Sequence, residues 1–412
     1  MTTATFPPLT VETVAIDALR ADPANPRRID PDELDALERS IRTWGIVQPV
    51  VARREDRVVI GGHQRLVAAR RLGHATISVI WLDLPTDQAR LLGLALNNIG
   101  GSWDEQLLAR LLAELDATPE LDVSLSGFEP DEVTTLVRSL AAREKRDQPE
   151  AFDLDAALEE AGRTRRAKPG DIWALGDHRL GCLDATNPAD IARLLDGQRP
   201  AMAFTDPPFN VAMGPKRRPA GARGRRPIAN DDLDPAAWET FVRAWAGTLV
   251  ARVDGALYVC MSGKEWPTVA RLLAEAGGHW SDTIIWAKDR FTLGRAPLQR
   301  GYEPIWFGWR EGVSAYWCGD RDQSDVWRID RPSSSPLHMT MKPLPLIERA
   351  IGNSSVAGDL VLDLFGGSGS TLIASERTAR RCAMAELDPL YVDVILARWE
   401  RFSGHGAVRL DG

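Results

Sequence analysis

The sequence lacks the features that mark membrane, secreted and metal-binding proteins. None of its 412 residues lies in an uncharged apolar run that approaches the roughly 18 residues of a membrane span. Its start, MTTATFPPLT, has neither the basic beginning nor the apolar block of a signal peptide. Its four cysteines lie far apart, with no CxxC pair and no histidine at ligand spacing. These absences predict a cytoplasmic protein with reduced thiols, no membrane partner, no metal site and no disulfide framework.

Positive charge is also scarce overall, since the net charge is −8. However, residues 1–150 hold 17 basic and 24 acidic side chains, whereas residues 168–412 hold 30 of each. Within this neutral part, residues 211–229 carry six basic side chains and no acidic one. Local clustering matters more than total charge for a polyanionic partner, so this basic run is either a DNA-contacting arm or a solvated loop. Its members are Lys216, Arg217, Arg218, Arg223, Arg225 and Arg226.

Four segments differ in pattern along the chain. Residues 1–87 contain short apolar strands and two helices, which predicts a small α/β domain. Residues 88–142 have apolar side chains spaced at about 3.6 residues, which predicts a helical segment. Residues 143–168 are charged and poor in large apolar groups, as is typical of a linker. Residues 169–405 make up the longest segment and are expected to form the main domain.

In this main domain, short apolar strands alternate with helices. Strands are expected at 172–176, 201–209, 255–262, 280–289, 302–310, 359–369 and 382–389, and helices at 235–253, 266–277, 344–354 and 370–379. Such alternation predicts an α/β fold with a mainly parallel, doubly wound sheet that is covered on both faces. In sheets of this kind, ligands bind beyond the carboxyl ends of the strands.

One motif at such a strand end is a glycine turn, LVLDLFGGSGS at 360–370. Gly366, Gly367 and Gly369 allow the backbone to approach a ligand closely. No GK[ST] follows, and Leu372 stands where a third dinucleotide-binding glycine would be, so neither ATP nor NAD is favoured. The next strand ends at Glu386, whose carboxylate is expected to accept hydrogen bonds from ribose hydroxyls. A plain tight turn is the alternative interpretation.

A second motif is the strand AMAFTDPPF, which ends in Asp206-Pro207-Pro208-Phe209. Two prolines cannot continue a ladder, so the strand must end there. A carboxylate, a carbonyl before a rigid proline pair and an aromatic ring together form a receptor suited to a base with an exocyclic amine. A chance tetrapeptide at the strand end is the alternative.

With both motifs present, residues 168–404 resemble the β class of DNA amino-methyltransferases. Asp206–Phe209 is similar to the family's [DNS]PP[YFW] motif, Phe365–Gly369 to its FxGxG motif, and Lys342-Pro343 to the start of another donor-binding segment. The resemblance implies a Rossmann-like methyltransferase sheet and S-adenosylmethionine as cofactor, with Asp206, Pro207, Pro208 and Phe209 as catalytic residues. The implied cofactor-binding residues are Asp184, Ala185, Lys342, Pro343, Asp363, Phe365, Gly366, Gly367, Gly369, Ser370 and Glu386.

The implied reaction transfers a methyl group to the amino group of a base flipped out of double-stranded DNA. Phe209 would stack on the base, while Asp206 and the Pro207 carbonyl would accept the two amino protons. An Asp at the first motif position goes mostly with adenine in this family, which predicts N6 of adenine; N4 of cytosine is the alternative. Residues 210–335 are expected to contain the target-recognition region.

Near the N-terminus, residues 11–100 resemble the ParB/sulfiredoxin-like N-terminal domain. The similarity rests on NPR at 25–27, on the segment at 34–52 and on Gly61-Gly62-His63-Gln64-Arg65. In ParB proteins the corresponding glycine box holds nucleotide phosphates, but His63 and Gln64 depart from it. A nucleotide at this domain, a homodimer and a partner restriction enzyme therefore stay open. The competing function is a ParB-like regulator that binds DNA or nucleotide and carries an inactive methyltransferase fold.

Overall fold

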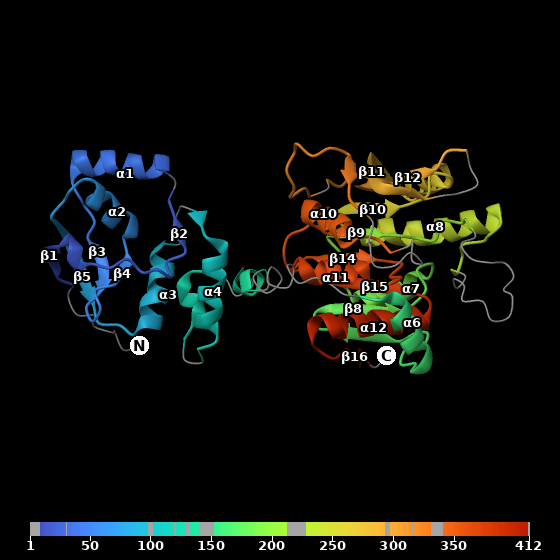
Figure 1. Ribbon diagram of the computed structural model, residues 1–412, viewed down its shortest axis with the longest axis horizontal. Coiled ribbons are helices and arrows are strands. Elements are labelled where there is room, and N and C mark those ends of the chain that lie inside the picture. Colours follow the sequence, from blue (N-terminus) through green and yellow to red (C-terminus); the bar gives the residue numbers. More distant parts are fainter. Residues whose placement is uncertain are drawn as a thin grey trace. The chain divides into compact units, whose positions relative to one another are not determined.

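The computed structural model describes residues 9–29, 31–97, 102–118, 121–128, 132–137, 139, 152–211, 228–292, 297–314, 316–330 and 341–410. The chain separates into two compact units, Met1–Ala141 and Ala142–Gly412 (Figure 1). The first unit joins the predicted α/β domain of residues 1–87 to the predicted helical segment of residues 88–142, so these two segments are not separate bodies.

The first unit is built on a small sheet with strand order β1-β5-β3-β4. Its helix α1 buries Leu34 and Ile41 and is followed by Gly45, which has a positive φ of 73°. Strands β3 and β4 pair antiparallel. The elements in chain order are β1 (Val11–Ala15), a 3-10 turn (Ile16–Ala18), β2 (Arg27–Arg28), α1 (Pro31–Trp44), β3 (Val50–Arg53), β4 (Val59–Gly61), α2 (His63–Arg71), β5 (Thr76–Leu82), α3 (Thr86–Asn97), β6 (Ser102–Trp103), α4 (Glu105–Asp116) and a 3-10 turn (Val123–Ser126).

The second unit contains a ten-stranded sheet with strand order β13-β11-β12-β10-β9-β14-β15-β8-β7-β16. Its elements are α6 (Leu154–Arg163), β7 (Ile172–Leu175), β8 (His178–Cys182), α7 (Pro188–Leu195), β9 (Met202–Thr205), α8 (Pro235–Arg252), β10 (Ala256–Cys260), α9 (Trp266–Glu275), β11 (Gly278–Thr292), β12 (Arg300–Arg310), β13 (Val326–Arg328), α10 (Leu344–Ser354), β14 (Leu360–Asp363), α11 (Ser370–Arg377), β15 (Arg381–Glu386), α12 (Pro389–Ser403) and β16 (Val408–Leu410).

The five central strands, β10, β9, β14, β15 and β8, are parallel to one another. Toward the edges, β12 pairs antiparallel with β10 and β11, and β7 pairs antiparallel with β8 and β16. The prediction of a mainly parallel, doubly wound sheet is therefore confirmed, with antiparallel pairs on both sides of the parallel centre. Alternation of apolar residues along a chain does not specify which strand becomes the neighbour of which.

Helices cover both faces of this sheet, as a doubly wound fold requires (Figure 1). One core cluster packs Leu360 and Leu362 of β14 with side chains of α7, α8 and α9. Val361, the intervening residue, belongs to a cluster on the other face with α10 and α11. Helix α12 completes that second face against β7, β8 and β15.

Part of the predicted linker at 143–168 is a folded element. Residues Leu154–Arg163 form α6, whose Leu154 and Ala161 are buried against Leu390 and Val394 of α12. Asp153 caps this helix by accepting hydrogen bonds from the backbone N–H groups of residues 155 and 156. Because charged side chains dominate the composition of this segment, composition alone did not predict the helix, whose apolar stripe is short.

Candidate active site

The carboxyl ends of β9 and β14 lie side by side, because these strands pair with Met202 opposite Val361 and Ala203 opposite Leu362. A cavity of about 590 Å³ opens beyond them. Such a volume lies in the range of small-molecule sites. The predicted site residues that line this cavity are Asp184, Ala185, Asp206, Pro207, Pro208, Phe209, Lys342, Asp363, Phe365, Gly366, Gly367, Ser370 and Glu386.

Two other predicted residues lie beside the cavity rather than among its lining side chains. Pro343 is the N-cap of α10, and Gly369 is the N-cap of α11 with a positive φ of 84°. The six residues of the basic run, between Lys216 and Arg226, lie outside the described residues. The two motifs are thus brought together in space, while the basic arm stays a prediction.

Hydrogen bonds join the two strand ends. The Thr205 hydroxyl donates to Oδ1 of Asp363 at 3.0 Å, and the backbone N–H of Leu364 donates to that hydroxyl at 3.2 Å. The backbone N–H of Phe365 also donates to Asp363 Oδ1, at 3.0 Å. Burial raises the pKa of Asp363 to about 7. Asp363 therefore fixes the start of the glycine turn relative to strand β9.

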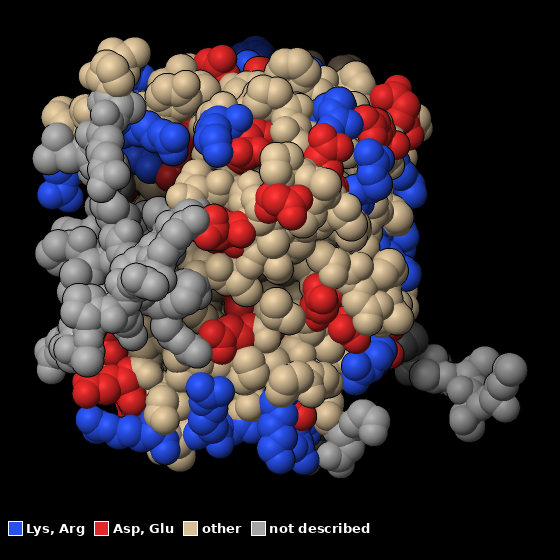
Figure 2. All heavy atoms as spheres, turned by 90° about the vertical axis from the view of Figure 1, so that its right-hand side faces the viewer, with Lys and Arg blue, Asp and Glu red and all other residues tan. Residues whose placement is uncertain are grey.

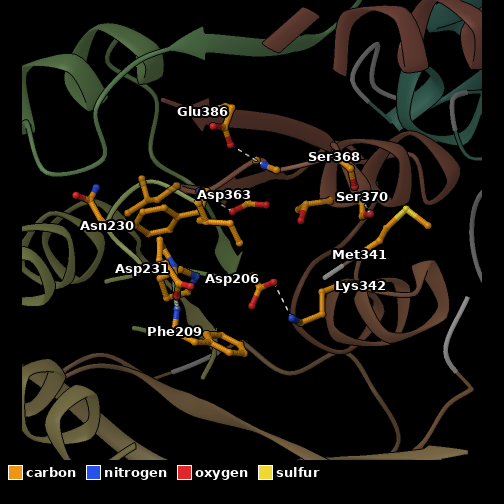
Figure 3. A pocket seen from close by; sticks show the side chains of 18 of the residues that line it. Asp206, Phe209, Asn230, Asp231, Met341, Lys342, Asp363, Ser368, Ser370 and Glu386 are labelled. Atoms are coloured by element: carbon orange, nitrogen blue, oxygen red, sulfur yellow. Dashed lines mark hydrogen bonds and ion pairs between the residues drawn. The ribbon is translucent and has the colours of Figure 1, made fainter. Parts of the chain in front are cut away.

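Asp206 forms an ion pair with Lys342, whose Nζ lies 2.6 Å from Asp206 Oδ2 (Figure 3). Burial raises the pKa of Asp206 above its usual value, and the positive charge of Lys342 opposes that rise. The other oxygen, Oδ1, is buried and has no hydrogen-bond partner among the described residues. A buried acceptor without a partner is costly, so this oxygen is a natural place for a ligand donor.

Sequence reasoning missed two charged residues of this site, Glu303 and Lys288. Glu303 Oε2 lies 3.1 Å from the Lys342 ammonium group, and Glu303 Oε1 forms a hydrogen-bonded ion pair with Lys288. Glu303 lies on β12 and Lys288 on β11, far from either motif in the sequence. The sequence does contain one signal, because Glu303 precedes an apolar run in the strand YEPIWFGWR. This pattern does not indicate which residue would pair with the acid.

The turn after the Asp206–Phe209 tetrapeptide is held by an aspartate that sequence reasoning also missed. Asp231 Oδ1 accepts hydrogen bonds from the backbone N–H groups of Phe209 and Val211, at 3.1 and 3.2 Å. Asn210 has a positive φ of 51° and accepts a hydrogen bond from the backbone N–H of Leu233 at 2.8 Å. These bonds fix the position of the Phe209 backbone. The centre of the Phe209 ring lies 5.2 Å from the Lys342 ammonium group.

At the glycine turn, the backbone passes directly against Glu386. The N–H of Gly367 donates to Glu386 Oε2 at 2.8 Å, and the N–H of Asp388 donates to Oε1 at 2.9 Å (Figure 3). Burial raises the pKa of Glu386 to about 7. Gly367 has a positive φ of 52°, and a side chain at Gly366 would collide with Met384. Glycine is thus required at this turn both for conformation and for space.

Asp184 and Ala185 lie next to this acidic strand end. The backbone N–H of Leu183 donates to the carbonyl of Glu386 at 3.1 Å, which places the following residues at the cavity. Asp184 Oδ1 accepts from the backbone N–H of Thr186 at 2.9 Å and from its hydroxyl at 2.7 Å. Asp184, Ala185 and Glu386 thus line neighbouring parts of the cavity.

The first unit has a smaller cavity of about 200 Å³ beside the two ParB-like motifs. Asn25 and Pro26 of the NPR motif line it together with His63. Burial lowers the pKa of His63, which favours the neutral imidazole. Gly62 caps α2 with a positive φ of 93°, and Arg65 forms a hydrogen bond with Gln48. The glycine box is therefore a real helix start.

In the described segments, no helix combines the length and the apolar composition needed to cross a bilayer. Nor do His, Cys, Asp or Glu side chains there gather in threes in a way that would hold a metal ion.

Residues 201–397 match the family model described as DNA methylase, and residues 3–98 match that of the ParB N-terminal domain. The type II methyltransferase M2.MboI of Moraxella bovis is 45% identical over 98 residues, which are 23% of this chain and 32% of that protein. The type II methyltransferase M.Cfr9I of Citrobacter freundii is 34% identical over 144 residues, which are 32% of this chain and 47% of that protein. The chain therefore spans less than half the length of these two curated relatives.

Among solved structures, the crystal structure of the M1.HpyAVI-SAM complex is similar with 20% sequence identity and a TM-score of 0.39. The match covers 52% of this chain and 96% of that one. The DNA methylase match falls on the second unit of the fold and contains both strand-end motifs, and the ParB match falls on the first unit. The chain thus carries a DNA methylase domain of the N6/N4 family, preceded by a ParB N-terminal domain.

Proposed function

We propose that this protein is a DNA methyltransferase that transfers a methyl group from S-adenosylmethionine to the exocyclic amino group of a base in double-stranded DNA. The observation that carries the proposal is the meeting of Asp206 and the glycine turn in one cavity. The family match of residues 201–397 supports it. An inactive methyltransferase fold would have no need to keep both motifs complete at adjacent strand ends.

The residues at the glycine turn fit the methyl donor. Glu386 offers a buried carboxylate to the ribose hydroxyls, and the turn at Gly366 and Gly367 permits close approach of the ligand to the backbone. Asp184 and Ala185 would contact the adenine end. S-adenosylmethionine bound there supplies a methyl group on a positively charged sulfur, and the residues of the chain orient the acceptor toward it.

The target amine would bind on the side of the cavity formed by Asp206 and Phe209. An unpartnered buried Asp206 Oδ1 would accept one amino proton, and the Pro207 carbonyl would accept the other. These two bonds draw the nitrogen lone pair away from the ring and toward the methyl group. Phe209 offers its ring for stacking on the base, which must leave the duplex to reach this depth. Positioning and electrostatics then account for most of the rate.

Adenine N6 is the proposed acceptor atom, because the motif begins with Asp206 and not with serine. Double-stranded DNA is the proposed partner, with residues 210–335 as the recognition region. A homodimer and a nucleotide at the ParB-like domain stay open.

Mass spectrometry of nucleosides tests this proposal directly. The full chain is incubated with S-adenosylmethionine and genomic DNA amplified in vitro, which carries no methylation. We expect N6-methyladenine, and an Asp206→Asn variant should lose at least about 100-fold in methyl transfer while it binds the donor normally. N4-methylcytosine would overturn the adenine assignment and keep the enzyme class. DNA without any methylated nucleoside would contradict the proposed activity. Asp254→Asn, an exposed site in the same domain, serves as control.

A further inference from the structure

A row of four charged side chains runs from the catalytic strand into the antiparallel part of the sheet. Asp206 pairs with Lys342 at 2.6 Å, Lys342 pairs with Glu303 at 3.1 Å, and Glu303 pairs with Lys288. The side chains of Lys342 and Lys288 are each 8% exposed and that of Glu303 is 16% exposed, so water screens these pairs weakly. Signs alternate along the row, so each of the four charges lies next to one of opposite sign.

The row leaves the two oxygens of Asp206 in different environments. Oδ2 is held by the Lys342 ammonium group, whereas Oδ1 is buried without a hydrogen-bond partner among the described residues. A carboxylate anchored through one oxygen cannot rotate without breaking that ion pair. The anchor therefore determines which oxygen remains for an incoming donor.

Lys342 is itself fixed from several sides. Its ammonium group contacts Asp206 and Glu303 and lies 5.2 Å from the ring centre of Phe209 and 6.0 Å from that of Trp286. Figure 3 shows Asp206 between Phe209 and Lys342, with Glu386 at the far end of the labelled set. The contacts of Lys342 are thus with the groups proposed to receive the base, not with the acid proposed to receive the ribose.

We propose that Lys342 is a positioning residue for the acceptor base. Its ammonium group holds the Asp206 carboxylate ionised and oriented, so that Oδ1 is left for the amino group of the base. Glu303 and Lys288 hold Lys342 in place. This role rests on the proposed methyl transfer, since it names what aligns the carboxylate in that reaction. It differs from the donor-binding role that the sequence resemblance implies for Lys342.

Five groups act on the charge of Asp206 from the elements packed around it. Lys342 and Lys288 favour its ionised form, whereas Glu303 disfavours it. Cys260 on β10 and Asp363 on β14 are the other titratable neighbours. Burial pushes the pKa of Glu303 upward, but the two lysines outweigh burial and keep that pKa below its usual value. Removal of the Lys342 charge should therefore raise the pKa of Asp206, and removal of the Glu303 charge should lower it.

The pH dependence of kcat/KM tests the proposal on the full-length protein, with radiolabelled S-adenosylmethionine and genomic DNA amplified in vitro. In Lys342→Met the acid limb should move to a pH at least about one unit higher, with donor affinity unchanged by calorimetry. In Glu303→Gln the limb should move to lower pH. Lys342→Arg keeps the charge and should keep the limb in place even if the rate falls. Lys168→Met, at an exposed lysine, is the control and should match the wild type.

Carbon-13 spectra of labelled aspartate carboxyls provide a readout without catalysis, with the Asp206 signal identified by its absence in Asp206→Asn. The midpoint of that signal should rise in Lys342→Met and fall in Glu303→Gln. Equal losses of rate at every pH, with an unmoved Asp206 midpoint, would overturn the proposal and leave Lys342 a packing residue. If the wild type does not methylate DNA, the proposed function fails, and the carboxyl titration still decides whether Lys342 controls Asp206.

Discussion

The buried carboxylates of Glu386 and Asp363 both line the cavity, and they differ in their hydrogen-bond partners. Burial raises the pKa of both Glu386 and Asp363 to about 7, but their partners differ. Asp363 is used within the fold, where it accepts from Thr205 and Phe365. Glu386 accepts only backbone N–H groups in the described contacts and lines the cavity, so it has lone pairs left for a ligand. Asp363 thus has a structural role, whereas Glu386 is the carboxylate that we propose for donor binding.

From this difference a pH dependence of donor binding follows. Ribose hydroxyls bind the ionised carboxylate more strongly, so donor binding must displace a proton from Glu386 below its pKa of about 7. Affinity for S-adenosylmethionine should rise between pH 6 and pH 8 and fall up to about tenfold per pH unit below the pKa. Calorimetry measures it. Glu386→Gln should bind weakly and without this dependence, whereas Asp363→Asn should retain it. A wild-type affinity that is constant over this range would contradict the role of Glu386.

At the residue scale, the sequence predicted those site residues that are adjacent to one another in the chain. Asp206 to Phe209 and the glycine turn are adjacent residues at strand ends, so both motifs were predicted, and the structure places them at one cavity. Glu303, Lys288 and Asp231 are isolated in sequence and meet the site only through antiparallel strand pairing or a loop closure. Such contacts follow from pairing register, which no local pattern encodes.

At the scale of elements, β9, β10 and β14 were predicted because each is a short run of buried apolar residues between helices. Helices α7 and α12 were not predicted. Strands β8, β13 and β16 were not predicted, and neither was the antiparallel pairing of β7 with β8 and β16, because this pairing comes from tertiary packing. Helix α6 was missed for a related reason. Its apolar side is only Leu154, Ala157, Leu158 and Ala161, and its stability comes from packing on α12.

The glycine turn between β14 and α11 makes a test of close packing at this scale. An added Cβ at Gly366 would lie 2.8 Å from the Met384 side chain, so Gly366→Ala should lower the free energy of unfolding by about 1–3 kcal/mol and weaken donor binding. Gly352, in α10, has no atom within 4 Å of such a Cβ. Gly352→Ala should instead raise the free energy of unfolding by up to about 1 kcal/mol. Urea denaturation compares them, and equal stability of Gly366→Ala and wild type would show that Met384 gives way.

For the whole molecule, net charge opposes DNA binding, so attraction must be local. Figure 2 shows a face on which acidic side chains lie across the middle, with Lys and Arg mainly toward the edges. Replacement of Arg217, Arg218, Arg225 and Arg226 by Gln should weaken DNA binding and reduce the slope of log affinity against log salt by up to about four. Arg243→Gln with Arg271→Gln, at exposed ion-paired sites, is the control. An unchanged slope in the fourfold variant would mean that the basic run is a solvated loop.

The division of the chain into two units predicts where the methylase unit can be separated. A fragment that begins at Ala142 contains α6 and the whole ten-stranded sheet, so it should fold and bind S-adenosylmethionine. A fragment that begins at Ala167 lacks α6, whose Leu154 both packs on α12 and lines the cavity. It also lacks Arg166, which pairs with Glu400 of α12 at 2.8 Å.

The shorter fragment should therefore lose at least about 2 kcal/mol of stability and bind the donor more weakly. Calorimetry and thermal denaturation of both fragments measure this difference, with Leu154→Ala in the full chain as a matched variant that removes only the apolar contact. Equal stability and donor affinity of the two fragments would mean that α6 is dispensable and that residues up to 166 act as a linker after all. A longer fragment that fails to bind the donor would show instead that the ParB-like unit is needed to complete the fold.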